Sequence, residues 1–283
     1  MINYEKEFLN ACKYILEQGV DIQNERTGSI CRTVPFLHFS YNVGAGEVPI
    51  LTVKQVFWKS AVAEIIGYMN GITDAHKFDE LGAKTWYANA NKTKAWLINP
   101  NRKGENDMGK VYGAVAKDFN GVDLIKKVYT NLKNGIDDRG EIITFWNPAD
   151  FDKGCLRPCL MQHHFTLIGD TLHLTSYQRS CDMGLGFNFN SIQVYFLLAF
   201  MAKASGHKAG IANHIVVNAH FYENQFEPLM EMLGREPLDV PHPNLEFTIP
   251  DFVEFPWENF NPKHHISLTN YEHLGKIEFP FTE

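Results

Sequence analysis

A thiol, a guanidinium, an amide and a histidine–tyrosine pair fall within one stretch of the chain, residues 155–222. Cys159 follows Pro158 and precedes a predicted strand, which places its side chain at a strand edge. Arg179 favours a nucleophilic role for this thiol, because a nearby guanidinium lowers the pKa of a cysteine and stabilises the thiolate. Most cysteines only pack in the interior. Cys159 is therefore a candidate nucleophile, with packing as the alternative.

The polar residues that follow suit a small anionic substrate. Arg179-Ser180 has the form of a phosphate grip, a guanidinium plus a hydroxyl, although an arginine paired with a structural carboxylate has the same pattern. Asn190 precedes an apolar segment and is either a helix N-cap or an amide that reads a donor–acceptor edge, such as that of a pyrimidine. His220 and Tyr222 alternate along an extended segment and share one face, as core residues or as ligands for sugar hydroxyls.

A metal site is suggested by four residues that lie close together in the sequence: Cys155, Cys159, His163 and His164. Their spacing matches none of the usual zinc patterns. Strand alternation also sends neighbouring side chains to opposite faces of a sheet, which separates the members of such a group. We therefore expect no metal site here.

The composition is that of a globular protein without general affinity for nucleic acid. The 283 residues are 45% hydrophobic and 13% aromatic, enough to fill a core. The formal charge of −7 argues against binding to DNA, which needs a dense positive surface. Five cysteines without a signal peptide favour a reducing compartment, and the longest apolar run, residues 194–202, is too short to cross a bilayer. We expect a cytoplasmic protein with no membrane partner.

Helical signals come before the reactive stretch. Apolar periodicity predicts an amphipathic helix over residues 4–18. Thr52-x-x-Gln55 has the form of a capping box and predicts a second helix over residues 52–69. Glu64 falls within the apolar part of that helix, either on its solvent side or held in a pocket for proton transfer.

The remaining segments predict alternating strands and helices. The clearest is a β-hairpin, because Gly169-Asp170 is a two-residue turn with glycine first, as a type II′ turn requires. Residues 191–205 are apolar almost all round, which is typical of a helix at the centre of a fold. We expect strands over 141–146, 162–168, 171–177 and 215–217, helices over 122–133 and 222–233, and a surface loop over 86–108. Together they predict a single α/β domain over residues 1–283.

These motifs together resemble the thymidylate synthases. The similarity is carried by Cys155-Leu-Arg-Pro-Cys159, Gln178-Arg-Ser-Cys-Asp182, Phe189-Asn190 and Asn218-Ala-His-Phe-Tyr222, in the order and spacing of that family. Weaker agreement extends over nearly the whole chain, at Glu25-Arg-Thr-Gly28, Ala63-Glu64, Thr85-Trp86, Val111-Tyr-Gly113 and Trp146-Asn147. The resemblance implies an α/β (α+β) fold in which helices cover a mixed, twisted β-sheet and the sheet forms the interface of a homodimer.

The resemblance also implies a methyltransferase. Its reaction is the reductive methylation of dUMP by 5,10-methylenetetrahydrofolate, which gives dTMP and dihydrofolate. Cys159 would add as a thiolate to C6 of the uracil, so that C5 becomes a carbanion equivalent and captures the one-carbon unit of the folate. Because the folate also supplies the hydride, neither a nicotinamide cofactor nor a metal is expected.

By the same resemblance, each further site residue has an expected role. The residues expected to organise water and move protons beside Cys159 are Glu64, Tyr112 and Asn147. Asp182, which would reach both the folate and the pyrimidine, is also expected to be catalytic. The residues expected to bind dUMP are Arg26, Arg179, Ser180, Asp182, Asn190, His220 and Tyr222, together with the partner subunit's Arg139. The folate is expected to lie against Trp86, Leu156, Asp182 and Phe281, beneath a C-terminal tail that closes over the ligands.

Several positions depart from the common pattern of the family. Arg139 matches the first of two arginines that reach the phosphate site of the other subunit, but Gly140 stands at the second position, so a thinner contact is expected. Leu160 replaces a common histidine, and Phe187-Asn188 stands where many members have Leu-Pro. Such variants are similar to those of a distinct bacterial subgroup of synthases.

Two other functions remain open from the sequence. One is a pyrimidine hydroxymethylase of the same fold, in which water rather than hydride quenches the intermediate. Asn190 argues against a dCMP enzyme, where an aspartate usually stands, but leaves dUMP hydroxymethylation open, while Trp86 and the tail favour reduction. The other is a non-catalytic member that binds nucleotide or RNA, such as its own mRNA. Cys159 together with Glu64 argues against it, because a binding protein needs neither.

Overall fold

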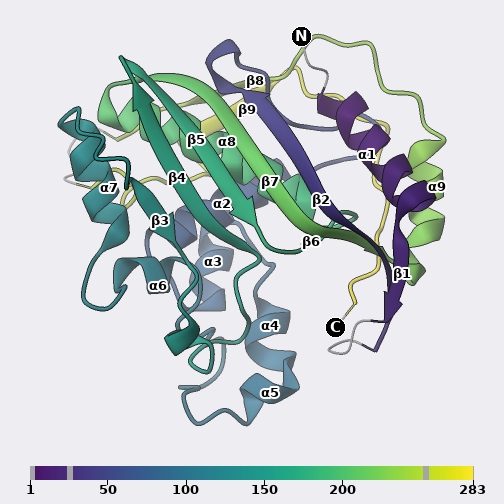
Figure 1. Cartoon of the computed structure of the whole chain (residues 1–283), viewed down its shortest axis with the longest axis horizontal. Coiled ribbons are helices and arrows are strands. Elements are labelled where there is room, and N and C mark those ends of the chain that lie inside the picture. Colours follow the sequence, from purple (N-terminus) through teal and green to yellow (C-terminus); the bar gives the residue numbers. More distant parts are fainter. Residues whose placement is uncertain (1–3, 24–27, 251–254, 283) are drawn as a thin grey trace.

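A mixed sheet, with seven strands in the described residues, organises the chain (Figure 1). The computed structural model describes residues 4–23, 28–250 and 255–282. The strands follow the order β1-β2-β7-β5-β4-β3, and β6 pairs with β7 beside this path. Their bounds are β1 (Val20–Gln23), β2 (Ile30–Asn42), β3 (Ile142–Thr144), β4 (Leu160–Ile168), β5 (Thr171–Gln178), β6 (Cys181–Asp182) and β7 (Lys208–Tyr222).

Two strands, β5 and β6, run parallel to β7, whereas the other neighbours are antiparallel. Parallel neighbours need a crossover, and α8 (Gly186–Ser205) supplies it between β6 and β7. Most residues of α8 are buried, as its apolar sequence predicts. This crossover brings the polar residues at three strand ends, Gln178, Asp182 and His220, to one side of the sheet.

The predicted hairpin is confirmed, and its strands are longer than expected. β4 and β5 pair along their lengths around Gly169-Asp170. Gly169 has a φ of 63°, a backbone conformation that favours glycine. Just beyond the open end of the hairpin, the N–H of Arg179 donates to Cys159 O at 2.9 Å. The strand pairing therefore places the arginine beside the cysteine.

Helices cover one face of the sheet and its margins (Figure 1). α8 packs on β7 and on α2 (Trp58–Met69), and buried aromatic rings fill the space around it. The other helices are α1 (Tyr4–Gln18), α3 (Ala75–Leu81), α4 (Tyr87–Lys92), α5 (Lys94–Leu97), α6 (Gly113–Lys117), α7 (Leu124–Lys133) and α9 (Phe226–Leu233). Short 3₁₀ turns lie at η1 (Val43–Ala45), η2 (Pro148–Asp150) and η3 (Glu223–Gln225), and β8 (Asn244–Phe247) pairs with β9 (Ile266–Thr269). No helix in the described ranges is both long enough and apolar enough to cross a bilayer.

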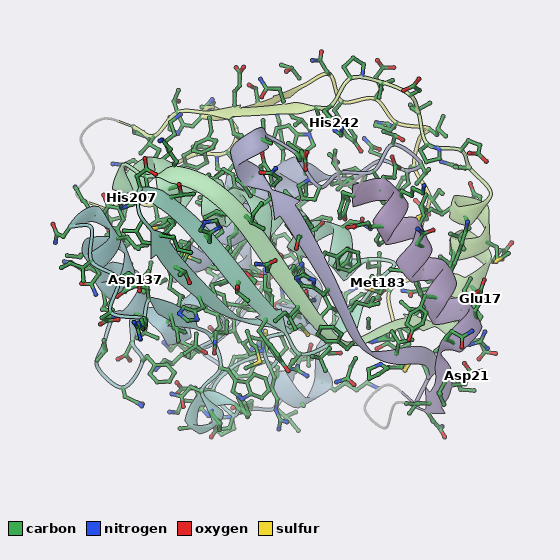
Figure 2. The ribbon with its side chains drawn as sticks, turned by 45° about the horizontal axis from the view of Figure 1, so that its top comes forward. Glu17, Asp21, Asp137, Met183, His207 and His242 are labelled. Carbon is green, nitrogen blue, oxygen red and sulfur yellow. The ribbon has the colours of Figure 1, made fainter. Side chains whose placement is uncertain are left out.

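The opposite face of the sheet leaves large apolar side chains exposed. Phe36 on β2 is 54% exposed and Tyr177 on β5 is 37% exposed. Their cross-strand partners on β7 are half-buried. Asp21 on β1 marks one edge of the sheet, and Asp137, in the loop before β3, marks the other (Figure 2). An exposed apolar face of this extent is typical of an interaction surface.

The predicted capping box at Thr52 is wrong. α2 begins only at Trp58. The N–H of Thr52 donates instead to Glu5 Oε1 at 2.7 Å, and its hydroxyl donates to Glu5 Oε2 at 2.8 Å, so a distant carboxylate on α1 takes the place of the local cap. Glu64, within α2, is only 8% exposed, which decides against its placement on the solvent side.

Other boundaries also differ from the predictions. α8 begins at Gly186, so Asn190 lies inside the helix and does not cap it. The segment 86–108, predicted as a loop, contains α4 and α5. The short strand predicted over 215–217 is the middle of β7, and the helix predicted over 222–233 is a 3₁₀ turn followed by α9.

Candidate active site

Cys159 lies just before β4, half-buried between two groups that can act on it. Its backbone N–H donates to Tyr112 Oη at 3.2 Å. Arg179 Nη2 lies 3.8 Å from its Sγ. A guanidinium at this position stabilises a thiolate relative to a thiol, which suits Cys159 to nucleophilic attack. The neighbouring Cys155 is different, because burial raises the pKa of its thiol to about 12.

Neutral groups hold the guanidinium of Arg179 in place. Its Nε donates to Pro158 O at 2.8 Å and its Nη2 donates to Arg157 O at 3.1 Å. Its Cζ lies 5.1 Å from the centroid of the Trp146 ring. These partners fix the guanidinium without neutralising its charge. With Ser180 next in the chain, the group remains suited to bind an anion.

Glu64 is a buried carboxylate that accepts two short hydrogen bonds. Thr85 Oγ1 donates to its Oε1 at 2.6 Å, and Gln193 Nε2 donates to its Oε2 at 2.6 Å. Burial raises the pKa of Glu64, whereas the hydrogen bonds from Thr85 and Gln193 lower it. A buried carboxyl group with a raised pKa is suited to take up and release a proton.

An aromatic cluster joins the surroundings of Glu64 to the thiol. The rings of Tyr68 and Tyr112 stack with their centroids 4.3 Å apart and an interplanar angle of 5°. Trp86 meets Tyr112 edge-on, with centroids 5.6 Å apart. Tyr112 has a φ of 46°, which is uncommon for a residue with a side chain. Burial, and then the charge of Cys159, raise the pKa of Tyr112, so it remains a neutral phenol.

Asn190 lies on α8 between two glutamine side chains. Its Oδ1 accepts from Gln178 Nε2 at 2.8 Å. Its Nδ2 donates to Gln193 Oε1 at 2.9 Å. Because Gln193 also donates to Glu64, a continuous line of hydrogen bonds joins Asn190 to the buried carboxylate.

His220 and Tyr222 lie at the end of β7, both buried, with their ring centroids 5.1 Å apart. Nδ1 of His220 is 2.8 Å from Asn218 O. A carbonyl oxygen only accepts, so Nδ1 carries a proton and Nε2 is the atom left to face a ligand. Asn218 itself has a φ of 49°, a conformation that asparagine adopts more readily than most residues.

Asp182 fixes the turn that leads into α8. Its Oδ1 accepts from the N–H groups of Gly184 at 2.9 Å and Leu185 at 3.1 Å, and its Oδ2 accepts from Gln225 Nε2 at 2.9 Å. Burial raises the pKa of Asp182, while these hydrogen bonds and the charge of His220 lower it. The carboxylate thus connects β6, α8 and the turn after β7.

Four predicted site residues are not part of this cluster. Asn147 is buried, and its Nδ2 donates locally to Asp150 Oδ2 at 2.9 Å. Arg139 is exposed in the loop before β3 with a φ of 66°. Phe281 is 62% exposed. Arg26 lies outside the described residues.

The four residues with metal-binding atoms do not form a metal site. Within the described ranges, no three side chains of His, Cys, Asp or Glu come together in a way that could hold an ion. His163 is instead a core residue, with its Nδ1 2.7 Å from Ser176 Oγ. Burial lowers its pKa to about 3, so it is neutral at ordinary pH.

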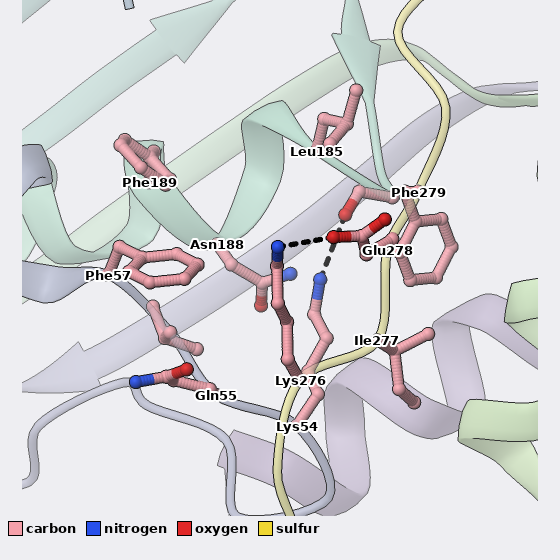
Figure 3. A pocket seen from close by; sticks show the side chains of 12 residues that line it. Lys54, Gln55, Phe57, Leu185, Asn188, Phe189, Lys276, Ile277, Glu278 and Phe279 are labelled. Carbon is pink, nitrogen blue, oxygen red and sulfur yellow. Dashed lines mark hydrogen bonds and ion pairs between the residues drawn. The ribbon is translucent and has the colours of Figure 1, made fainter. Parts of the chain in front are cut away.

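A cavity of about 250 Å³ opens between α8 and the C-terminal segment (Figure 3). Lys54 Nζ, on its wall, donates to Gly184 O at 2.9 Å and lies 4.5 Å from the centroid of the Phe279 ring. Burial lowers the pKa of Lys54 to about 8. Asn188 also lines the cavity, and both polar atoms of its amide are buried without a partner among the described residues. The cavity therefore offers polar groups to a ligand.

The C-terminal segment runs from this cavity to the turn at Asp182. Gln225 Nε2 donates to Pro280 O at 3.1 Å as well as to Asp182. Trp86 is buried in the aromatic cluster, and Leu156 is partly buried against the core. The tail and the site are thus joined through one glutamine side chain.

The sequence of the chain is similar to those of known proteins. Residues 6–283 match a family model described as thymidylate synthase. The chain is 48% identical to the thymidylate synthase of Shewanella frigidimarina and 48% identical to that of Aliivibrio fischeri. It is 47% identical to that of Vibrio cholerae. Each alignment covers 98% of this chain and 99% of the relative. The chain belongs to the thymidylate synthase family.

Three residues of this thymidylate synthase family member were not predicted from the sequence. Gln193 carried a signal, because it is a polar residue three positions after Asn190 in an otherwise apolar helix. Lys54 and Gln225 carried none. Their partners, Gly184 and Asp182 among them, lie far away in sequence, and only the fold brings them together.

Proposed function

We propose that this chain catalyses the reductive methylation of dUMP by 5,10-methylenetetrahydrofolate, giving dTMP and dihydrofolate. Family membership over nearly the whole chain supports the reaction. The observation that carries it is the thiol of Cys159 beside the guanidinium of Arg179 at 3.8 Å, because the reaction begins with a thiolate.

The chemistry follows from that thiolate. Sulfur of Cys159 forms a bond to C6 of the uracil, and the electron pair of the C5–C6 double bond moves to C5. C5 then bonds to the methylene carbon of the folate as the bond from that carbon to N10 breaks, and a base removes the C5 proton. Loss of the tetrahydrofolate amine leaves an exocyclic methylene, which takes a hydride from the same folate, and the cysteine is expelled. Carbon and hydride both come from one co-substrate, so the reaction needs no metal or nicotinamide.

Arg179 has two roles. With Ser180 and Arg26 it binds the dUMP phosphate, and its position beside Cys159 favours the thiolate. The partner subunit's Arg139 adds a further positive charge at the phosphate. Because the guanidinium of Arg179 is fixed by neutral carbonyls, it is ready for an anion before the nucleotide arrives.

Glu64 transfers protons to and from the uracil ring, and Tyr112 and Asn147 position water there. The buried position of Glu64 and its raised pKa support this role. Asn190 binds the N3/O4 edge of the uracil. His220, through Nε2, and Tyr222 bind the 3′ hydroxyl of the deoxyribose.

The folate lies against Trp86, Leu156 and Asp182, and Phe281 closes over it with the tail. Lys54 and Lys276 line the neighbouring cavity, and this basic lining suits a carboxylate of the folate. Gln225 supports the closure, since it holds Pro280 against the Asp182 turn.

The active form is a homodimer joined through the exposed face of the sheet. Phe36 and Tyr177 provide apolar surface on that face. The enzyme works in the cytoplasm, as its free cysteines favour. Light scattering of the purified chain at micromolar concentration is expected to give twice the mass of one chain. A monomer that still turns over dUMP would separate the dimer from the activity.

The activity is tested by incubating the purified chain with dUMP and 5,10-methylenetetrahydrofolate. The rise in dihydrofolate absorbance is followed, and the nucleotide product is identified by mass. We expect dTMP and dihydrofolate in equal amounts. Hydroxymethyl-dUMP with tetrahydrofolate would identify a hydroxymethylase, and absence of turnover would leave only nucleotide binding.

A further inference from the structure

Six buried or half-buried side chains form one line of hydrogen bonds through the centre of the fold. Tyr41 Oη lies 3.0 Å from His214 Nδ1, and His214 Nε2 lies 2.8 Å from Gln178 Oε1. Gln178 donates to Asn190, and Asn190 donates to Gln193. The line ends at the carboxylate of Glu64, to which Gln193 donates. The proposed reader of the uracil thus lies in the middle of this line.

Backbone carbonyls fix the direction of the two glutamines. Gln193 Nε2 donates to Ala61 O at 3.3 Å, and Gln178 Nε2 donates to Ser180 O at 3.2 Å. A carbonyl oxygen accepts only, so in both glutamines the NH₂ group must lie on the side seen here. The Oε1 of Gln193 therefore faces Asn190 as an acceptor, and the Nε2 of Gln178 faces it as a donor.

The glutamines leave Asn190 one orientation. A flipped amide would set its Oδ1 against Gln193 Oε1 and its Nδ2 against Gln178 Nε2. Both hydrogen bonds would be lost, and two like groups would face each other in a buried place. Ionised Glu64 adds to this, because it accepts only and so keeps the NH₂ group of Gln193 turned towards it.

The fixed amide is complementary to uracil and not to cytosine. Each bond to a glutamine uses one lone pair of Asn190 Oδ1 and one hydrogen of its Nδ2, which leaves one acceptor and one donor for a base. Uracil offers an N3–H donor and an O4 acceptor, and both are matched. Cytosine in the same position offers a bare N3 to Oδ1 and an amino group to Nδ2, and both are mismatched.

We propose that Gln193 is a specificity-determining positioning residue, which locks the amide of Asn190 in the orientation that selects uracil over cytosine nucleotides. The inference rests on the proposed function, since it assigns selectivity to the same site. Gln193 acts through Asn190 and does not touch the base. Its helix position and its 0% exposure make it part of the core, yet its polar atoms are all directed to the site and to α2.

The test compares dUMP with dCMP in the full-length enzyme. Gln193→Met keeps the length of the side chain and removes both its donor and its acceptor. The ratio of kcat/KM for dUMP to that for dCMP is expected to fall by about 10-fold or more, because Asn190 can then flip. Dissociation constants of both nucleotides, measured by calorimetry, should converge in the same way. Gln178 and Gln193 together form a clamp on the amide of Asn190. Gln178→Met removes the other half of this clamp and should give the same convergence of the two nucleotides.

Ser191→Ala is the matched control. Ser191 is the residue next to Asn190, is fully buried and bonds Tyr4 Oη at 3.0 Å, so its loss disturbs the same part of α8 without touching the clamp. Its ratio is expected to stay within about twofold of the unaltered enzyme. A purely structural role of Gln193 would lower both rates together and leave the ratio unchanged.

Failure of the proposed function and failure of the inference about Gln193 give different results. If the unaltered chain neither binds nor converts dUMP, the proposed function fails, and with it the inference. If dUMP is converted but both Met variants keep the original ratio, or Ser191→Ala changes it equally, the clamp does not set specificity. Convergence in either Met variant, with Ser191→Ala unchanged, supports the inference even when the other variant does not fold.

Discussion

The side chains around Cys159 bond to one another and to backbone carbonyls, whereas those around the cavity at Lys54 leave polar atoms unsatisfied. On the first side, Arg179 and Asn190 each have several fixed partners. On the second side, the amide of Asn188 is buried with no partner among the described residues. Buried polar groups without partners destabilise a fold. Apart from Nε1 of Trp86, which is also buried without a partner among the described residues, the nucleotide side is thus hydrogen-bonded before a ligand binds, whereas the cavity side leaves interactions for a ligand to supply.

The supporting elements differ in the same way. The nucleotide side is carried by strand ends and α8, whose positions are fixed by the sheet. The cavity is closed by residues 276–279, which belong to no strand or helix (Figure 3). Preorganised groups lower the cost of binding, so dUMP should bind first and to a site that changes little. Four variants test this contrast, from the largest effect to the smallest.

Cys159→Ser should have the largest effect. Replacing the nucleophile is expected to lower kcat by roughly 10⁴-fold or more, because a hydroxyl is a far poorer nucleophile than a thiolate. Binding of dUMP, measured by calorimetry, should persist, since the other contacts are fixed independently. Cys155→Ala is the control, because that thiol is buried with its pKa raised to about 12. Comparable activity in both variants would contradict the assignment of the nucleophile.

Glu64→Gln should lower kcat by roughly 10²- to 10⁴-fold with a smaller change in dUMP binding. The pH dependence of stability gives a second readout. Burial raises the folded-state pKa of Glu64, so the native state binds this proton more tightly than the unfolded state. Stability from this group is therefore present in acid and falls as the pH rises through the folded-state pKa. In Glu64→Gln, this pH-dependent part of the stability should be absent from urea midpoints measured between pH 4 and 8. A profile that is the same in both proteins would argue against a raised pKa of Glu64.

Lys54→Met should raise the KM for the folate about tenfold and leave the KM for dUMP unchanged, because Lys54 belongs to the cavity side. The unaltered enzyme should also lose folate affinity above a pH of about 8, where the amine loses its charge. The variant should not show this loss. Lys208→Met, which removes an exposed amine paired with Asp170 at the hairpin turn, away from the cavity, is the control with an expected change of less than about twofold. Equal effects on both substrates would show that the two sides are not independent.

Asn188→Leu should have the smallest effect and the opposite sign. An apolar side chain of similar size removes two unsatisfied polar atoms from the interior, which should stabilise the free protein by about 1 kcal/mol. If the amide of Asn188 binds the folate, the KM for the folate should rise in the same variant. Thermal unfolding with and without folate measures both effects. A lower melting temperature without ligand would mean that the amide already has a partner.

The local parts of the fold were predictable, and the parts set by distant partners were not. The hairpin at Gly169 and the helix over residues 4–18 follow from neighbours in sequence, and both are confirmed. The capping box at Thr52 fails because Glu5, far away in sequence, takes its hydrogen bonds. Asn190 shows the same limit for one of its two partners, since Gln193 is a neighbour on the same helix but Gln178 meets Asn190 only because of how α8 crosses behind the sheet.

The candidate site shows the same division between residues indicated by local sequence and residues that depend on distant partners. Motif spacing indicated Cys159 and Arg179, and strand pairing brings them together. Gln193 and Lys54 were absent from the prediction because their roles appear only when α2, α8 and the C-terminal segment meet. Asn147 and Arg139 stay predictions that rest on the family.

The pairing of β2 with β7 has a consequence during synthesis on the ribosome. Cys31 on β2 lies opposite Tyr222 on β7, 191 residues later. At about 5–20 residues per second, the early strand waits about 10–40 s for its neighbour. Throughout that time its edge is unpaired and its apolar side chains are exposed, which is the condition under which nascent chains aggregate. The order of the strands therefore leaves this edge of β2 without its neighbour until most of the chain has been made.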